Sequence, residues 1–142
     1  MQSLFPDICC DDVKAARDFY VALFGFEPVF ENAWYAQLRS PADSNLQIAF
    51  VQRDHDSVPA AHRLRPQGVL VTIVVDDAAA HYRRALEQRA PIVQALRDEV
   101  FGQRHFMAQD PTGLCVDVVE WIPFAPEFAR EHGVPVEGDG TA

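Results

Sequence analysis

The side chains best suited to chemistry lie on two predicted strands in the second half of the chain. Asp117 stands among valines in the run Leu114–Trp121, and His105 follows Arg104 in the run Phe101–Ala108. A carboxylate buried among apolar side chains needs a partner, a water channel or a ligand, and an imidazole can act as a general base near neutral pH. Asp117 and His105 are therefore the candidate catalytic residues. The competing interpretations are a structural ion pair of Asp117 with Arg104 or another arginine, and a surface or structural role for His105.

A second group of residues is expected to face a small-molecule pocket. Successive side chains of a strand point to opposite faces, so Ile48 and Phe50 are predicted to pack on a helix, whereas Gln47 faces the other way. Trp34 and Trp121 can stack on a planar ligand, although aromatic residues in strands also serve as core or dimer contacts. A mostly apolar lining with a few polar groups is typical of organic-ligand sites. The predicted ligand-binding residues are Phe5, Asp7, Trp34, Gln47, Leu70, Thr72, Arg104, Asp117 and Trp121.

Composition limits the other function classes. The 142 residues suit one domain with a real core, and 49% of them are hydrophobic. A net charge of −9 argues against nucleic-acid binding; it could steer a cationic ligand or only favour solubility. No apolar stretch approaches the roughly 20 residues of a membrane helix, and the N-terminus does not resemble a signal peptide, so we expect no membrane partner and a cytoplasmic protein. Cys9, Cys10 and Cys115 form no C-x-x-C pair and are expected to be reduced thiols.

The order of predicted elements repeats. In each half an Asp-Asp pair follows a strand and offers an N-cap to a helix, and Asp12 and Asp77 lie 65 positions apart. The first half is predicted to contain strands at Leu4–Cys10, Glu27–Glu31, Trp34–Arg39 and Leu46–Gln52, with a helix that ends at Gly25. The second is predicted to contain strands at Val69–Val75, Pro91–Leu96, Phe101–Ala108 and Leu114–Trp121. This pattern predicts an α+β fold of two β-α-β-β-β modules.

Three stretches define the domain organisation. Module 1 covers about residues 1–52, a polar linker covers 53–68, and module 2 covers about 69–122, so that 1–122 form a single domain. Residues 123–142 form a partly disordered C-terminal extension, in which Pro126–His132 is a candidate short helix and Val136–Ala142 is expected to be frayed.

Several motifs in this order resemble the vicinal oxygen chelate superfamily, which holds glyoxalase I, extradiol dioxygenases and the bleomycin-resistance proteins. Asp12–Tyr20 with Leu23–Phe26 looks like the first helix of the family and its Leu-Gly-Phe end. The last hairpin of the family is matched by Phe101–Phe106, Asp110–Gly113 and Val116–Glu120. The resemblance spans Leu4 to Trp121. It implies that the two modules form a cup-shaped mixed sheet and that the protein is a homodimer.

The same resemblance argues against the metal site of the family. Its metal-binding positions map onto Phe5, Gln47, Leu70 and Asp117. Phenylalanine and leucine cannot bind a metal, a glutamine amide is a weak ligand, and one carboxylate does not hold a transition ion. The resemblance therefore implies no metal and no cofactor.

Two main functions follow from these expectations. The first is binding of an aromatic or cationic small molecule in an apolar cup without a metal, as in the antibiotic-resistance members of the superfamily. The second is a lyase, isomerase or dioxygenase with a non-standard metal site around Asp7, His105 and Asp117, or with metal-free acid-base catalysis by Asp117. A regulatory metabolite-binding protein is a third possibility that the sequence does not separate from the first.

Overall fold

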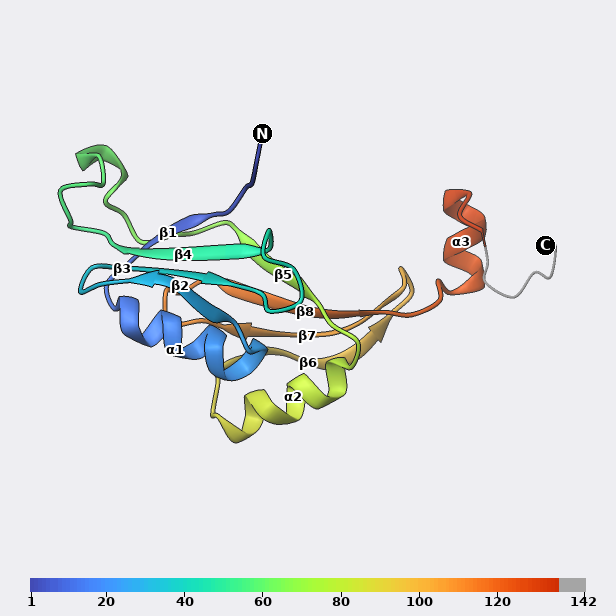
Figure 1. Ribbon diagram of the computed structural model, residues 1–142. Helices are drawn as coiled ribbons and strands as arrows, with labels where there is room; N and C mark the ends of the chain where they lie inside the picture. The colour runs from blue at the N-terminus through green and yellow to red at the C-terminus, as the bar shows by residue number, and fades with distance from the viewer. Residues whose placement is uncertain (136–142) are drawn as a thin grey trace. The chain divides into compact units, whose positions relative to one another are not determined.

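The computed structural model describes residues 1–135 and confirms the α+β fold of two β-α-β-β-β modules (Figure 1). The chain forms two compact units. The first contains Met1–Val69 and Gln109–Leu114; the second contains Leu70–Ala108 and the described residues from Cys115 onward. The predicted fraying of Val136–Ala142 lies outside the described residues. Within residues 1–135, no helix is both long and apolar enough to cross a membrane.

The first unit holds a four-stranded sheet and one long helix. Its elements are β1 (Asp7–Cys10), α1 (Val13–Phe24), β2 (Glu27–Glu31), β3 (Tyr35–Arg39) and β4 (Gln47–Gln52), and the strand order is β1-β4-β3-β2. β1 pairs with β4 in parallel, and the other pairs are antiparallel. The predicted first strand began at Leu4, but β1 begins after Pro6 because proline has no N–H to donate to the sheet. Only an isolated bridge between Leu4 and Leu46 extends the pairing.

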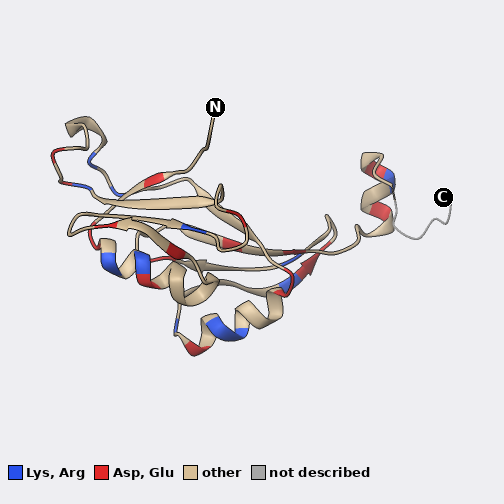
Figure 2. Ribbon diagram, viewed as in Figure 1, with Lys and Arg blue, Asp and Glu red and all other residues tan. Residues whose placement is uncertain are grey.

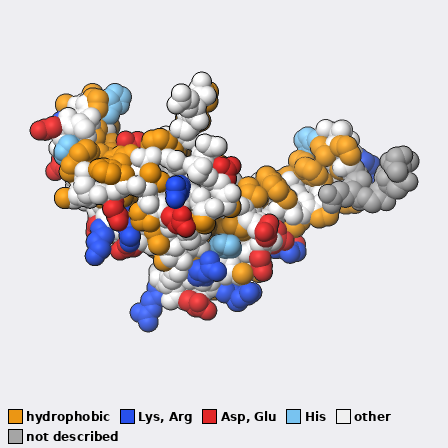
Figure 3. Space-filling view, in the orientation of Figure 1, with side chains coloured by type: hydrophobic (Ala, Val, Ile, Leu, Met, Phe, Trp, Pro, Cys, Tyr) orange, Lys and Arg blue, Asp and Glu red, His pale blue; other side chains and the backbone are white. Residues whose placement is uncertain are grey.

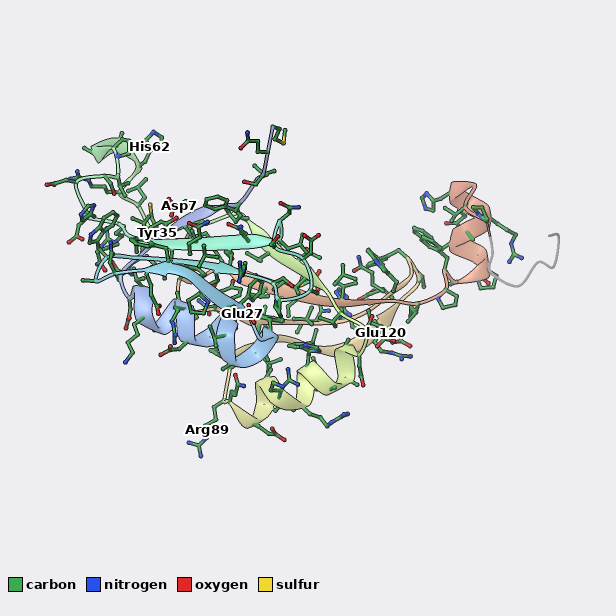
Figure 4. The ribbon with its side chains drawn as sticks, in the orientation of Figure 1. Asp7, Glu27, Tyr35, His62, Arg89 and Glu120 are labelled. Atoms are coloured by element: carbon green, nitrogen blue, oxygen red, sulfur yellow. The ribbon has the colours of Figure 1, made fainter. Side chains whose placement is uncertain are left out.

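Local chemistry sets the ends of α1. The Asp12 side chain accepts a hydrogen bond from the Ala15 N–H at 3.0 Å, which satisfies one of the free donors at the helix start. Gly25 ends the helix with a φ of 72°, a conformation that glycine adopts without a Cβ clash. α2 in the second unit begins in the same way, because Asp77 accepts from the Ala80 N–H. At its end, however, Arg89 carries the positive φ of 56° (labelled in Figure 4).

The core of the first unit forms between α1 and one face of the sheet. Tyr20 and Leu23 of α1 are fully buried, and the Tyr20 ring lies 5.2 Å from the Phe50 ring of β4. Ile8, Leu38 and Ile48 are also buried, at alternate positions of their strands. This confirms the predicted helix-facing role of Ile48 and Phe50. The side chains between these positions point to the other face of the sheet.

A buried carboxylate fixes the turn at residues 110–113 in the first unit. The Tyr20 hydroxyl donates to Asp110 Oδ2 at 2.6 Å. The other carboxylate oxygen accepts from the Thr112 N–H and hydroxyl and from the Leu114 N–H. Burial, followed by the charge of Asp110, raises the pKa of Tyr20, so the phenol stays protonated and remains a donor. The turn is therefore held by hydrogen bonds to α1 and within itself.

The second unit repeats the sheet order. It comprises β5 (Leu70–Val74), α2 (Ala78–Glu87), β6 (Ile92–Glu99), β7 (Gln103–Gln109), β8 (Cys115–Trp121) and α3 (Pro126–His132), with the strand order β5-β8-β7-β6. β6 reaches Glu99 instead of the predicted Leu96, because the charged residues 97–99 pair with residues 103–105 at the sheet edge. β7 starts at Gln103 and not at Phe101, since Gly102 with a φ of 83° belongs to the preceding turn.

The described part of the C-terminal extension packs on the β6–β7 turn. Phe128 of α3 stacks on Phe124 with nearly parallel rings and lies 6.3 Å from Phe101. The Ala125 N–H donates to the Val100 carbonyl at 2.9 Å. α3 has the bounds predicted from the sequence.

We predict that Tyr20→Phe lowers the free energy of unfolding by about 1–3 kcal/mol, because it leaves a buried Asp110 oxygen without its partner. Urea denaturation followed by circular dichroism measures the change. Tyr82→Phe is the matched control: the Tyr82 ring packs 5.1 Å from Phe106, and the loss of its hydroxyl should change stability by less than about 0.5 kcal/mol. Equal losses in the two variants would contradict the assigned role of Asp110.

Candidate functional site

A hollow lies in the first unit, between the sheet face opposite α1 and the chain that follows β4. Its volume is about 480 Å³, within the usual range for small-molecule pockets. The lining is largely apolar and aromatic. It consists of Asp7, Cys9, Phe30, Trp34, Tyr35, Val51, Ser57, Val58 and Pro59.

Strand register brings the floor of the hollow together. Cys9 of β1 and Tyr35 of β3 both lie opposite Val51 of β4. Asp7 stands two residues before Cys9, so its side chain points to the same face. Figure 4 labels Asp7 on β1 and Tyr35 on β3, the two strands that flank β4. The predicted shared face of Asp7 and Cys9 is thus present, and it is the face away from α1.

Residues 53–68, the predicted linker, form one wall of the hollow. Asp11 accepts hydrogen bonds from Arg53 Nε and, at 2.9 Å, from Arg65 Nε. We call these three residues the clasp, because they tie both ends of the segment to the residue that follows β1. Inside the segment, Arg63 Nε donates to the Val58 carbonyl at 2.8 Å, and Val58 is buried. Figure 3 shows hydrophobic side chains gathered where this segment meets the end of β4.

Three aromatic rings, tilted against one another by 45° and 56°, form one side of the hollow. Tyr35 lies 6.2 Å from Phe30 and 5.9 Å from Trp34, measured between ring centroids. The His55 ring stacks on Trp34 at 3.7 Å and within 5° of parallel. His55 is held in turn by Ser57, whose hydroxyl lies 2.8 Å from His55 Nδ1. The Trp34 indole therefore has one face fixed by the protein.

Asp7 provides the one carboxylate among the lining residues. Within residues 1–135 it has no hydrogen-bond or ion-pair partner, and desolvation raises its pKa. Desolvation, followed by the charge of Asp7, also raises the pKa of Cys9 and of Tyr35. At neutral pH the thiol and the phenol are therefore uncharged.

The structure brings only some of the predicted ligand-binding residues together. Asp7 and Trp34 line the hollow, but Phe5 and Gln47 do not. Gln47 Oε1 accepts from Gln37 Nε2 at 2.6 Å, and its own Nε2 donates to the Ser44 carbonyl at 2.7 Å. The amide of Gln47 is thus already satisfied within the sheet and the adjoining turn.

The two candidate catalytic residues contact each other in the second unit. His105 Nδ1 lies 2.7 Å from Asp117 Oδ1, and both residues are buried. The other ring nitrogen, Nε2, lies 3.2 Å from Glu99 Oε1 and 3.2 Å from Gln94 Nε2. Asp117 therefore has His105 as its partner, and not an arginine. Because both nitrogens of His105 face protein groups, the pair presents no free nitrogen to a substrate.

Arg104 is directed away from this pair. It donates to Asp98 at 2.7 Å and 3.0 Å and to Glu120 at 3.3 Å. Glu120, labelled in Figure 4, also accepts from the Ala78 N–H at the start of α2. Adjacent residues of a strand point to opposite faces, so Arg104 supports the helix side of the sheet, whereas His105 faces the other side.

Three further predicted residues lie on the second sheet with exposed side chains. Leu70 and Thr72 stand on the edge strand β5, where Thr72 is paired with Asp117 in the register. Trp121 ends β8 and is 64% exposed. None of the three belongs to the lining of the hollow in the first unit.

The fold and the sequence together establish the family. Residues 4–118 match the Glyoxalase/Bleomycin resistance protein/Dioxygenase superfamily, so the chain belongs to that superfamily. A protein of Mycobacterium bovis (strain ATCC BAA-935 / AF2122/97), itself described as uncharacterized, is 27% identical over 124 residues that cover 78% of each chain.

Two solved structures show how varied the similar proteins are. A lactoylglutathione lyase from Agrobacterium tumefaciens superposes with a TM-score of 0.67 at 21% identity, covering 82% of this chain and 91% of its own. TnmS3, an antibiotic binding protein from Streptomyces sp. CB03234, superposes with a TM-score of 0.66 at 18% identity, covering 85% and 96%. Such likenesses establish the fold and leave the activity to be argued from the site.

The residues of this chain do not fit the metal that the family implies. Phe5 and Leu70 have no metal-binding atom, and the Gln47 oxygen is hydrogen-bonded to Gln37. Asp117 is paired with His105. Across residues 1–135, no group of three or more His, Cys, Asp or Glu side chains is arranged to hold a metal ion.

We predict that Asp11→Asn loosens the wall formed by residues 53–68, because it removes the carboxylate that holds Arg53 and Arg65. Amide hydrogen exchange across this segment at pH 7 should become faster by about tenfold, as expected for a locally released loop. Asp76→Asn is the control, since it makes the same charge change at an exposed residue of the second unit.

The pH dependence of the clasp follows from the same contacts. Hydrogen bonding by Arg53 and Arg65 lowers the pKa of Asp11 from its ordinary 3.8. The stabilisation that ionised Asp11 gives to residues 53–68 is therefore complete above pH 3.8 and is lost as the pH falls through the lowered pKa. Exchange in the wild-type segment, corrected for the intrinsic rate, should stay protected from pH 7 to about pH 5. Loss of protection in the wild type between pH 7 and about pH 5 would argue against the clasp. Unchanged protection of the segment in Asp11→Asn would also argue against it.

Proposed function

We propose that the protein binds a small planar organic molecule in the hollow of the first unit, without a metal ion. The observation that carries this proposal is the aromatic side formed by Phe30, Trp34 and Tyr35, with Trp34 held in place by His55. Aromatic walls with few polar groups are the usual means of recognising flat organic ligands. The antibiotic binding protein of the same fold supports the idea that the scaffold can serve for binding.

Preorganisation strengthens this proposal. Binding costs less when the contact side chains are already fixed, and Trp34 is fixed on one face by His55 and through its backbone N–H, which donates to Asn32 Oδ1 at 2.9 Å. The clasp holds residues 53–68, the wall that includes Val58, through Asp11. A ligand would therefore lose little free energy in ordering these side chains when it binds.

A fragment screen tests the proposal with fused bicyclic and tricyclic aromatic compounds detected by ligand-observed NMR. We predict that the wild type gives several hits and that Trp34→Ala weakens them by about tenfold or more, the usual effect of removing an aromatic anchor. Trp121→Phe should leave the affinities unchanged, since Trp121 lies outside the hollow. Because Trp34 and Trp121 are the two tryptophans of the chain, that variant also makes fluorescence quenching a report on Trp34 alone.

Absence of hits in the wild type, or hits that survive Trp34→Ala unchanged, would contradict the proposed site. The metal-free part has its own test. Elemental analysis of protein purified without chelators, followed by titration with zinc, nickel, iron and manganese ions, should find no stoichiometric, tightly held metal. A bound metal at one equivalent would refute this part of the proposal and favour the enzyme alternative.

A further inference from the structure

The aromatic hollow contains one carboxylate, and among residues 1–135 that carboxylate has no hydrogen-bond or ion-pair partner. Asp7 is an exposed residue of the lining, two residues before Cys9 on β1. Figure 2 shows the acidic position on β1, and Figure 4 identifies it as Asp7. We propose that Asp7 makes the hollow selective for organic monocations, in which a protonated amine or amidinium group is attached close to a planar ring. This inference deepens the proposed function and rests on it.

The basic residues near the hollow are committed to other contacts. Arg53 and Arg65 donate to Asp11, and Arg63 donates to the Val58 carbonyl and lies 3.9 Å from Asp56. No lysine or arginine is among the lining residues. A cation supplied by a ligand is therefore the natural counterion of Asp7.

The uncharged neighbours of Asp7 also favour a positive ligand. The thiol of Cys9 and the phenol of Tyr35 carry raised pKa values and stay neutral at pH 7. The lining thus has one formal negative charge, and its surroundings are apolar enough to desolvate that charge in part. An ammonium group brought to Asp7 would form a charge-assisted hydrogen bond, which is stronger than a neutral one.

The aromatic side adds to the selectivity for a cation. The faces of Trp and Tyr rings attract cations at distances within about 6 Å of the ring centroid. Trp34 and Tyr35 stand next to each other, with their ring centroids 5.9 Å apart. A ligand whose ring packs on this side and whose charged nitrogen reaches Asp7 would satisfy the apolar and the acidic parts of the hollow together.

A matched pair of probes tests this inference on the full chain at pH 7. Naphthalen-2-ylmethanamine is a cation, and naphthalen-2-ylmethanol has nearly the same shape without the charge. We predict that the wild type binds the amine at least about tenfold more tightly than the alcohol, the difference expected for a hydrogen bond between charged groups in a partly desolvated site. Titration calorimetry or ligand-observed NMR measures both dissociation constants.

Asp7→Asn is the decisive variant, because it keeps the shape of the side chain and removes the charge. We predict that its amine-to-alcohol preference falls to near unity, whereas the dissociation constant of the alcohol changes by less than about twofold. Asp54→Asn is the control, since it removes one negative charge from an exposed position outside the lining. It should keep the wild-type preference.

The outcomes separate this inference from the function on which it rests. Equal binding of amine and alcohol by the wild type, with both lost in Trp34→Ala, would overturn the cation selectivity and leave the aromatic site standing. An equal loss of the amine preference in Asp7→Asn and Asp54→Asn would also overturn the selectivity assigned to Asp7. The preference would then depend on the net charge of the protein. If neither the amine nor the alcohol binds and the fragment screen gives no hits, the proposed function itself is refuted. Retained binding of the alcohol by Asp7→Asn shows that the variant is folded.

Discussion

The packing of Tyr20 on Phe50 determines which face of the first sheet is available for binding. Both residues are fully buried, with their rings 5.2 Å apart. Side chains alternate along a strand, so burial of Phe50 against α1 commits Val51, the next residue, to the opposite face. Register then places Cys9 and Tyr35 beside Val51. The composition of the hollow is thus a consequence of how the helix packs.

The sequence predicted the fold because each element has a local cause. Asp12 and Asp77 cap the two long helices as expected, and the alternation of side chains along a strand placed Phe50 of β4 on the face that packs on α1. The errors lie at strand ends, where tertiary contacts outweigh local preference. The charged end of β6 looks like a turn in isolation, but it is paired with β7, and backbone pairing does not depend on hydrophobicity.

The candidate site was less predictable, because a third of its lining residues come from a segment without periodicity. Asp7 was predicted from strand alternation and Trp34 from the ability of its ring to stack on a ligand, but Val58 and its neighbours stand in a polar stretch that resembles a linker. The one available signal was the position of Arg53 and Arg65 at the two ends of that stretch, and their common partner Asp11 is distant in sequence. Long-range ion pairs of this kind leave no local pattern. The opposite faces of Arg104 and His105, in contrast, follow from strand alternation alone.

The bond between Tyr20 and Asp110 joins residues that are 90 positions apart. Proteins are made from the N-terminus onward, and early segments can begin to fold during synthesis. The first unit includes Gln109–Leu114, so its core cannot be completed until that late turn has left the ribosome. While most of the second half is translated, the N-terminal half therefore lacks Asp110, which accepts the hydrogen bond of the buried Tyr20 hydroxyl. A chain truncated before Asp110 would lack part of its first unit as well as the end of its second.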